Sequence, residues 1–274
     1  MENVIELTGP KSGPTSIILA GVHGNEVCGV KAFEQLLPTL TIESGRVLFA
    51  YGNPRAIQQN VRFIEMNLNR AFKLEALFSE TERETYEYQR AQFLKTYLDQ
   101  ADALLDVHAS FTPGSQRFII CEKESMNIAK HLPFDLVASG FDNLEPGGTD
   151  GYMNSLSKIG VCIECGYLED ESSTEIAKKS ILAFLSVRGY IDSPLKIYTQ
   201  SQINFDYIYF TKTDNFKLAK QFNDFEKIPA GQLIGFDGEE EIRAKKDGII
   251  IFARNRDKIN DEAFLFGEYK KDLL

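Results

Sequence analysis

The stretch SIILAGVHGNEVCGVKAFEQLLP (residues 16–38) decides the fold that we expect for this chain. Its first part, residues 16–22, is a short apolar run of the kind found in strands buried on both faces. Glycines at the junction allow the backbone to turn tightly, and residues 25–38 have the apolar spacing of a helix. The stretch therefore predicts a buried strand, a sharp turn and a helix.

The same alternation of short apolar runs and helical segments continues over the next 150 residues. We expect further strands at residues 46–52, 103–109, 117–122 and 160–166. We expect helices at residues 80–98, near 124–132 and at 172–190, the first of them amphipathic with an exposed charged face. Strands that alternate with helices predict an α/β domain with a largely parallel sheet covered on both faces.

The pattern changes near residue 192, where the helical segments end. The β-rich runs that follow lie at residues 206–211, 231–236 and 248–253. Asp-Gly pairs at 237–238 and 247–248 lie beside these runs, and Asp-Gly between apolar runs is a strong hairpin signal. We therefore predict a first domain over residues 1–192 and a smaller all-β domain over residues 193–274.

The bulk composition limits the class of partner. The chain of 274 residues has a formal net charge of −10, which argues against nucleic acid because phosphate binding depends on Lys and Arg. We find neither a signal peptide nor an apolar run long enough to span a membrane. The four cysteines are few for this length, as in a reduced cytoplasmic protein, and we expect Cys162 and Cys165 to be buried thiols despite their C-x-x-C spacing.

Two histidines and a glutamate form the most informative set of polar residues. His23 and Glu26 lie in GVHGNE, at the end of the first predicted strand, and His108 lies in DVHAS, at the end of another. Ligands bind beyond the carboxyl ends of strands in open α/β sheets. Two imidazoles and one carboxylate are the ligand set of a catalytic zinc site, so we predict that these three residues bind a metal ion. Asp106 should face the same side as His108 and orient a ligand imidazole.

Glu164 is the candidate acid/base. It lies in VCIECG, an otherwise apolar strand, where a carboxylate is unfavourable unless it is paired or functional. In a zinc hydrolase a carboxylate takes a proton from the attacking water and returns it to the leaving amine. The alternative is a buried glutamate that forms an ion pair with Arg or Lys.

Candidate anion-binding residues lie in the predicted loop between residues 54 and 80. Arg62 could polarise a carbonyl group, and Asn69 and Arg70 of NLNR could hold a carboxylate, which arginine binds through two parallel hydrogen bonds. The alternative is that these are solvated side chains of a polar loop.

The motifs together resemble the succinylglutamate desuccinylase/aspartoacylase family, a branch of the zinc carboxypeptidase superfamily, over roughly residues 15–190. The resemblance implies that His23, Glu26 and His108 are ligands of one zinc ion per chain. It further implies that Glu164 is the catalytic glutamate, that Arg62 is the carbonyl-polarising arginine, and that Asn69 and Arg70 bind the substrate carboxylate. Asn67 is a departure, because aspartoacylase-like members usually carry Asp there. The implied fold is a mixed sheet flanked by helices, followed by an appended β domain.

We therefore expect a cytoplasmic zinc-dependent hydrolase that cleaves the amide bond of small N-acyl amino acids, with residues 1–192 as its catalytic domain. Two alternatives remain open: a carboxypeptidase-like zinc peptidase acting on short peptides, and a non-catalytic relative that binds a metal or ligand. The expected partner is a small-molecule substrate rather than nucleic acid or a membrane, and the sequence is also compatible with a homo-oligomer.

Overall fold

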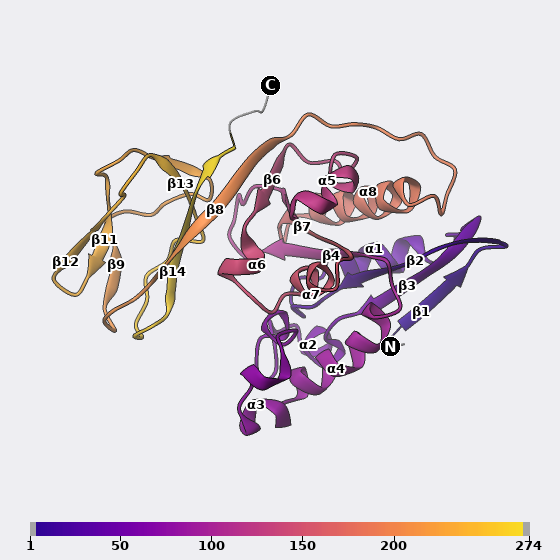
Figure 1. Cartoon of the computed structure of the whole chain (residues 1–274), viewed down its shortest axis with the longest axis horizontal. Coiled ribbons are helices and arrows are strands. Elements are labelled where there is room, and N and C mark those ends of the chain that lie inside the picture. Colours follow the sequence, from indigo (N-terminus) through magenta and orange to yellow (C-terminus); the bar gives the residue numbers. More distant parts are fainter. Residues whose placement is uncertain (1–3, 271–274) are drawn as a thin grey trace. The chain divides into compact units, whose positions relative to one another are not determined.

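The computed structural model describes residues 4–270, which divide into two compact units (Figure 1). Unit 1 comprises residues up to 137 together with 141–200, and unit 2 comprises residues 138–140 together with those from 201 onward. These units are defined by packing, so the predicted boundary of a catalytic domain at residue 192 stays a prediction. No helix within residues 4–270 is long and apolar enough to cross a bilayer.

Unit 1 is built on strands of a mixed sheet in the order β1-β3-β2-β4-β7-β5-β6, of which β6 belongs to unit 1 only in its first two residues. The central pairs β3–β2, β2–β4 and β4–β7 are parallel, as the alternating pattern predicted, whereas β1–β3 and β5–β7 are antiparallel. The mixed sheet implied by the family resemblance is thus confirmed. The strands are β1 (Val4–Thr8), β2 (Lys11–Ala20), β3 (Ser44–Tyr51), β4 (Ala103–Ser110), β5 (Phe118–Ile120), β6 (Leu136–Ser139) and β7 (Ile159–Tyr167).

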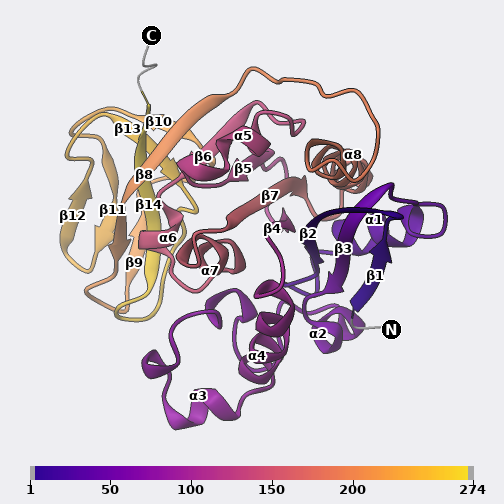
Figure 2. The ribbon, with the colours of Figure 1, turned by 45° about the vertical axis from the view of Figure 1, so that its right-hand side comes forward.

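Helices cover both faces of this sheet, as predicted (Figures 1 and 2). One apolar core lies between the sheet and helices α1 and α8, and a second lies between the opposite face and η1, α4 and α7. The helices of unit 1 are α1 (Cys28–Leu36), α2 (Pro54–Gln59), α3 (Glu80–Glu84), α4 (Tyr86–Leu98), α5 (Met126–Ala129), α6 (Phe141–Leu144), α7 (Thr149–Ser155) and α8 (Glu171–Val187), with 3-10 turns η1 (Leu68–Arg70), η2 (Glu75–Leu77) and η3 (Lys123–Ser125).

The helix expected over residues 80–98 differs from the prediction in two ways. It is divided into α3 and α4 at Thr85, whose extended backbone ends the first helix and whose hydroxyl accepts a hydrogen bond from the Tyr88 amide to cap the second. Its charged face is only partly exposed, because Glu87 and Arg90 are buried. The Arg90 guanidinium donates hydrogen bonds to the Tyr51 and Gly52 carbonyls at the end of β3 and therefore does not face the solvent.

Unit 2 is all-β and has its own aromatic core, centred on Phe216, Phe264 and Ile250. The predicted hairpin at Asp237-Gly238 joins β11 and β12, which pair antiparallel. The second Asp-Gly pair forms no such hairpin, since β12 and β13 belong to different sheets. The strands of unit 2 are β8 (Ser201–Phe210), β9 (Phe216–Leu218), β10 (Glu226–Ile228), β11 (Leu233–Asp237), β12 (Glu240–Arg243), β13 (Gly248–Ile251) and β14 (Glu262–Tyr269).

Candidate metal centre

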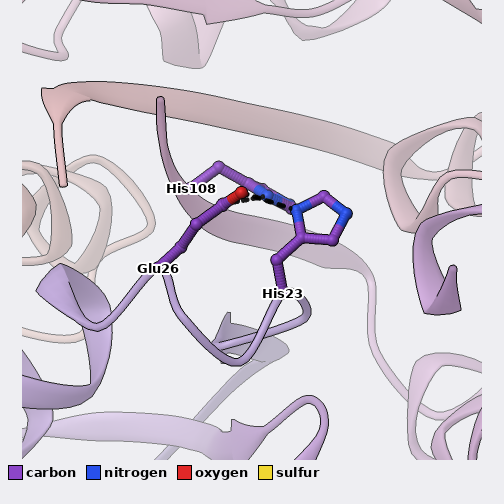
Figure 3. Close-up of side chains that lie close together, drawn as sticks. All are labelled: His23, Glu26 and His108. Carbon is purple, nitrogen blue, oxygen red and sulfur yellow. Dashed lines mark hydrogen bonds and ion pairs between the residues drawn. The ribbon is translucent and has the colours of Figure 1, made fainter. Parts of the chain in front are cut away.

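His23, Glu26 and His108 converge on one point at the carboxyl ends of β2 and β4 (Figure 3). Nδ1 of His23 lies 2.8 Å from Oε1 of Glu26, and Nδ1 of His108 lies 2.9 Å from Oε2 of the same carboxylate. All three side chains are buried, and one potential ligand atom from each lies within 4.8 Å of the other two. The structure therefore brings together the three residues that the sequence predicted as metal ligands.

Two glycines shape the turn that carries His23. Gly21 follows β2 with φ +69°, a left-handed conformation that disfavours other residues. Gly24 lies against the backbone of α2, where an added Cβ would come within 2.1 Å of the Ala56 carbonyl carbon. The chain therefore turns sharply before α1 and directs His23 and Glu26 toward β4.

Each imidazole is oriented through its second ring nitrogen. Nε2 of His23 lies 3.0 Å from Oδ1 of Asn67, and Nε2 of His108 lies 3.1 Å from Oδ2 of Asp106. Metal-binding histidines characteristically place the other ring nitrogen against a carboxylate or carbonyl in this way. The prediction that Asp106 orients a ligand imidazole agrees with this geometry, and Asn67 makes the corresponding contact to His23.

The electrostatics of the cluster favour a positive charge at its centre. Burial acts to raise the pKa of Glu26, but attraction to His23 and hydrogen bonds with His108 hold that pKa well below its ordinary value. Burial acts to lower the pKa of His108, yet Asp106 and Glu26 together raise it well above the ordinary value. Burial lowers the pKa of His23. The two carboxylates therefore draw a positive charge to the centre of the cluster, and a divalent cation bound by both imidazoles would supply it in place of the proton on His108.

Glu164 and Arg62 lie beside this cluster. Glu164 is half-buried on β7 and pairs in register with His108 on β4, so that both side chains point to the same face of the sheet. Arg62 follows α2, and its Nη1 lies 2.8 Å from Oε1 of Glu26. The catalytic roles predicted for these two residues stay predictions, but their positions are compatible with them.

Asn69 and Arg70 are tied to the cluster through Asn67. Oδ1 of Asn67, which faces His23, also accepts a hydrogen bond from the Asn69 amide at 2.9 Å. The Arg70 guanidinium donates to the Asn69 carbonyl and forms an ion pair with Glu145, with Nη2 and Oε2 separated by 2.7 Å. Their substrate-binding role stays a prediction, and Glu145 is a partner of Arg70 that the sequence analysis did not identify.

Glu87 is a second residue that the sequence analysis missed. Its buried carboxylate accepts hydrogen bonds from three consecutive amides of the 61–67 loop, Ile64, Glu65 and Met66, and thereby fixes the loop that carries Arg62 and Asn67. A glutamate in the first turn of a helix is a common feature that gave no signal of this role.

The remaining histidine and the cysteines lie outside the cluster. His131 makes a hydrogen bond through Nδ1 to the Lys196 carbonyl. All four cysteines are free and buried, so the expectation of buried thiols for Cys162 and Cys165 is confirmed.

Comparison with known proteins gives a consistent result. Residues 12–188 match the family model described as the succinylglutamate desuccinylase/aspartoacylase catalytic domain. A probable aspartoacylase from a Nostoc species is 28% identical over 189 residues, which cover 64% of this chain and 63% of that protein. The match therefore spans less than two thirds of that relative's length. A succinylglutamate desuccinylase from a Shewanella species (strain MR-4) is 25% identical over 270 residues, covering 86% of this chain and 76% of that protein.

The fold has close counterparts among solved structures. A succinylglutamate desuccinylase from Vibrio cholerae superimposes with a TM-score of 0.82 at 18% sequence identity, covering 97% of this chain and 85% of that one. At this identity the likeness concerns the fold, which is the mixed sheet with flanking helices and an additional antiparallel region.

Proposed function

The chain belongs to the succinylglutamate desuccinylase/aspartoacylase family, and from this membership we propose that it is a zinc-dependent hydrolase of small N-acyl amino acids. The observation that carries the proposal is the convergence of His23, Glu26 and His108, with Glu164 beside them on the adjacent strand. The relatives are named aspartoacylase and succinylglutamate desuccinylase, and both names denote removal of an acyl group from an amino acid.

In this proposal the zinc ion is held by His23, Glu26 and His108, whose inward nitrogen and oxygen atoms are of the type that zinc prefers. Zinc in such a site supplies Lewis acidity and makes water acidic enough to act as a nucleophile near neutral pH. Asn67, through its hydrogen bond with Nε2 of His23, and Asp106, whose carboxylate lies 3.1 Å from Nε2 of His108, keep the two rings in the ligating orientation.

In this proposal, side chains of the protein transfer the proton and bind the substrate. Glu164 accepts a proton from the attacking water and delivers it to the nitrogen of the breaking C–N bond, so that the products are a carboxylate and a free amine. Arg62 donates hydrogen bonds to the oxygen of the scissile carbonyl as negative charge develops there. Asn69 and Arg70 bind the carboxylate of the amino-acid half and align the amide with Glu164.

The four free cysteines support a reducing compartment such as the cytoplasm as the place of this reaction.

The test is a hydrolysis assay of Glu164→Gln with metal analysis of the same sample. Loss of the proton carrier should reduce kcat by about 10²–10⁴-fold while one metal ion per chain is retained. Glu169→Gln, which changes an exposed carboxylate just beyond β7, is the matched control and should keep the wild-type rate. A Glu164→Gln enzyme with near-normal kcat would remove Glu164 from the mechanism, and faster cleavage of short peptides than of N-acyl amino acids would favour the peptidase alternative.

A further inference from the structure

A small pocket in unit 1 lies on the same sheet face as the candidate metal centre. Its lining includes Asn69 and Arg70, Cys162 on β7, and three carboxylates that approach it from the 141–151 segment: Asp142, Glu145 and Asp150. Cys162 pairs in register with Asp106 and is two residues from Glu164, so it points to the same face as both. The pocket therefore adjoins the residues to which we assign the chemistry.

The charge of this pocket does not favour an acidic amino acid. Of the described residues that line it, Arg70 alone is cationic, and its charge is already balanced by the ion pair with Glu145. Asp142 accepts a hydrogen bond from the Asn154 side chain, and neither it nor Asp150 forms an ion pair within residues 4–270. Asp142, which has no cationic partner among the described residues, therefore gives the pocket an excess of negative charge whether or not Asp150, whose pKa burial raises to about 7, is ionised.

The hydrogen-bonding capacity of the pocket points in the same direction. The side-chain oxygen of Asn69 is buried and accepts no hydrogen bond from the described part of the chain. Buried acceptors are unfavourable unless a donor reaches them. A ligand group that enters here should therefore donate hydrogen bonds as well as carry positive charge.

We propose that this pocket receives the side chain of the substrate's amino acid and selects a cationic one, such as an amino-terminated chain, with Glu145 and Asp142 as the specificity-determining residues. This inference rests on the proposed hydrolase function. The amino-acid half is the part that reaches the pocket, because Asn69 and Arg70, to which we assign its carboxylate, belong to the pocket lining. An aspartate or glutamate side chain would add a further carboxylate to those present, and like charges brought together in one pocket are strongly unfavourable.

The experiment compares kcat/KM of the metal-loaded wild-type enzyme for Nα-acetyl-ornithine and Nα-acetyl-lysine with that for uncharged Nα-acetyl-norleucine and anionic Nα-acetyl-glutamate. We expect the cationic substrates to exceed the anionic one by about a hundredfold or more, since two unit charges near a protein surface interact strongly at about 5 Å. Preference for the glutamate or norleucine derivative would overturn the inference.

Two variants assign the preference to named residues. Glu145→Gln and Asp142→Asn should each lower the ratio of cationic to anionic kcat/KM by about tenfold, because one of the attracting charges is lost. In Glu145→Gln the released Arg70 should also improve kcat/KM for Nα-acetyl-glutamate. The control Glu175→Gln, on the exposed side of α8, changes the net charge equally and should leave the ratio unchanged. An unchanged ratio in both pocket variants would refute the assignment.

Calorimetric titration of the metal-loaded protein with the free amino acids separates this inference from the proposed function. If no N-acyl amino acid is hydrolysed, the proposed function fails, while tighter binding of ornithine or lysine than of glutamate would still support the cationic pocket. Equal or tighter binding of glutamate would contradict it whatever the enzyme hydrolyses.

Discussion

The buried carboxylate of Glu87 should control both the stability of the chain and the geometry of the metal centre. Its Oε1 accepts from the Asn53 side chain at 3.0 Å and from the Ile64 amide at 2.7 Å. Its Oε2 accepts from the Glu65 and Met66 amides at 3.1 and 3.2 Å. Four donors therefore converge on one fully buried side chain.

The substitution Glu87→Gln keeps the size of the side chain but replaces one of its acceptor oxygens with an NH₂ donor. Whichever end the NH₂ occupies, it faces two N–H donors, so two charge-assisted hydrogen bonds are lost. At about 1.5–3 kcal/mol each, the free energy of unfolding should fall by about 3–6 kcal/mol. The loop that carries Arg62 and Asn67 should also shift, and misplacement of such groups by about 1 Å can lower kcat/KM by about a hundredfold.

The assay is urea unfolding at fixed metal concentration, combined with kcat/KM measured at a temperature where the variant is folded. Glu84→Gln is the matched control, because Glu84 is exposed on the neighbouring helix α3 and its substitution should change the unfolding free energy by less than about 0.5 kcal/mol. A Glu87→Gln protein as stable and as active as this control would show that the loop does not depend on the four hydrogen bonds.

Two further predictions concern the metal centre and the adjoining pocket. Asn67→Ala removes the acceptor that orients His23, so metal affinity should fall about tenfold to a hundredfold in a competition titration with a chelator, and unchanged affinity would exclude the orienting role. Burial, with the nearby Asp142 carboxylate, raises the pKa of Asp150 from 3.8 to about 7, so the folded state binds this proton more tightly than the unfolded state and stability should fall as pH rises from about 4 to 7. Asp150→Asn should remove that loss of stability. Its unfolding free energy should match that of the wild type near pH 4 and exceed it at pH 8. A constant difference between the two proteins across this range would contradict the assignment.

The candidate ligands could be predicted from the sequence because their signals are local. His23 and His108 each follow an apolar run, and Asp106 lies two residues before His108, where the alternation of a strand fixes its side. These inferences need only the direction of each strand and the place where it ends. The structure agrees with them, since β2 and β4 are parallel neighbours and their carboxyl ends meet.

The residues that support the site could not be predicted, because their partners are distant in the sequence. Arg70 and Glu145 are joined by an ion pair across 75 positions, and nothing local to either residue indicates the other. Glu87 looked like part of a solvated helical face, since helical periodicity cannot distinguish a carboxylate facing water from one facing backbone amides. The break at Thr85 has no local signal either: neither Pro nor Gly marks it, and the Tyr86 amide that follows it donates to Glu65 from another segment.

Strand order, more than the motifs themselves, is what makes the site possible. The register pairs Leu19 with Asp106 and Asp106 with Cys162, which places the ends of β2, β4 and β7 side by side. The turn after β2 therefore brings His23 beside His108, and β7 brings Glu164 beside His108 on the other side. Had another strand separated β4 from β7, Glu164 would lie about 5 Å farther from the metal ligands, given the spacing of neighbouring strands. A proton carrier must be within hydrogen-bond reach of its water, so the proposed chemistry depends on β4 and β7 being neighbours.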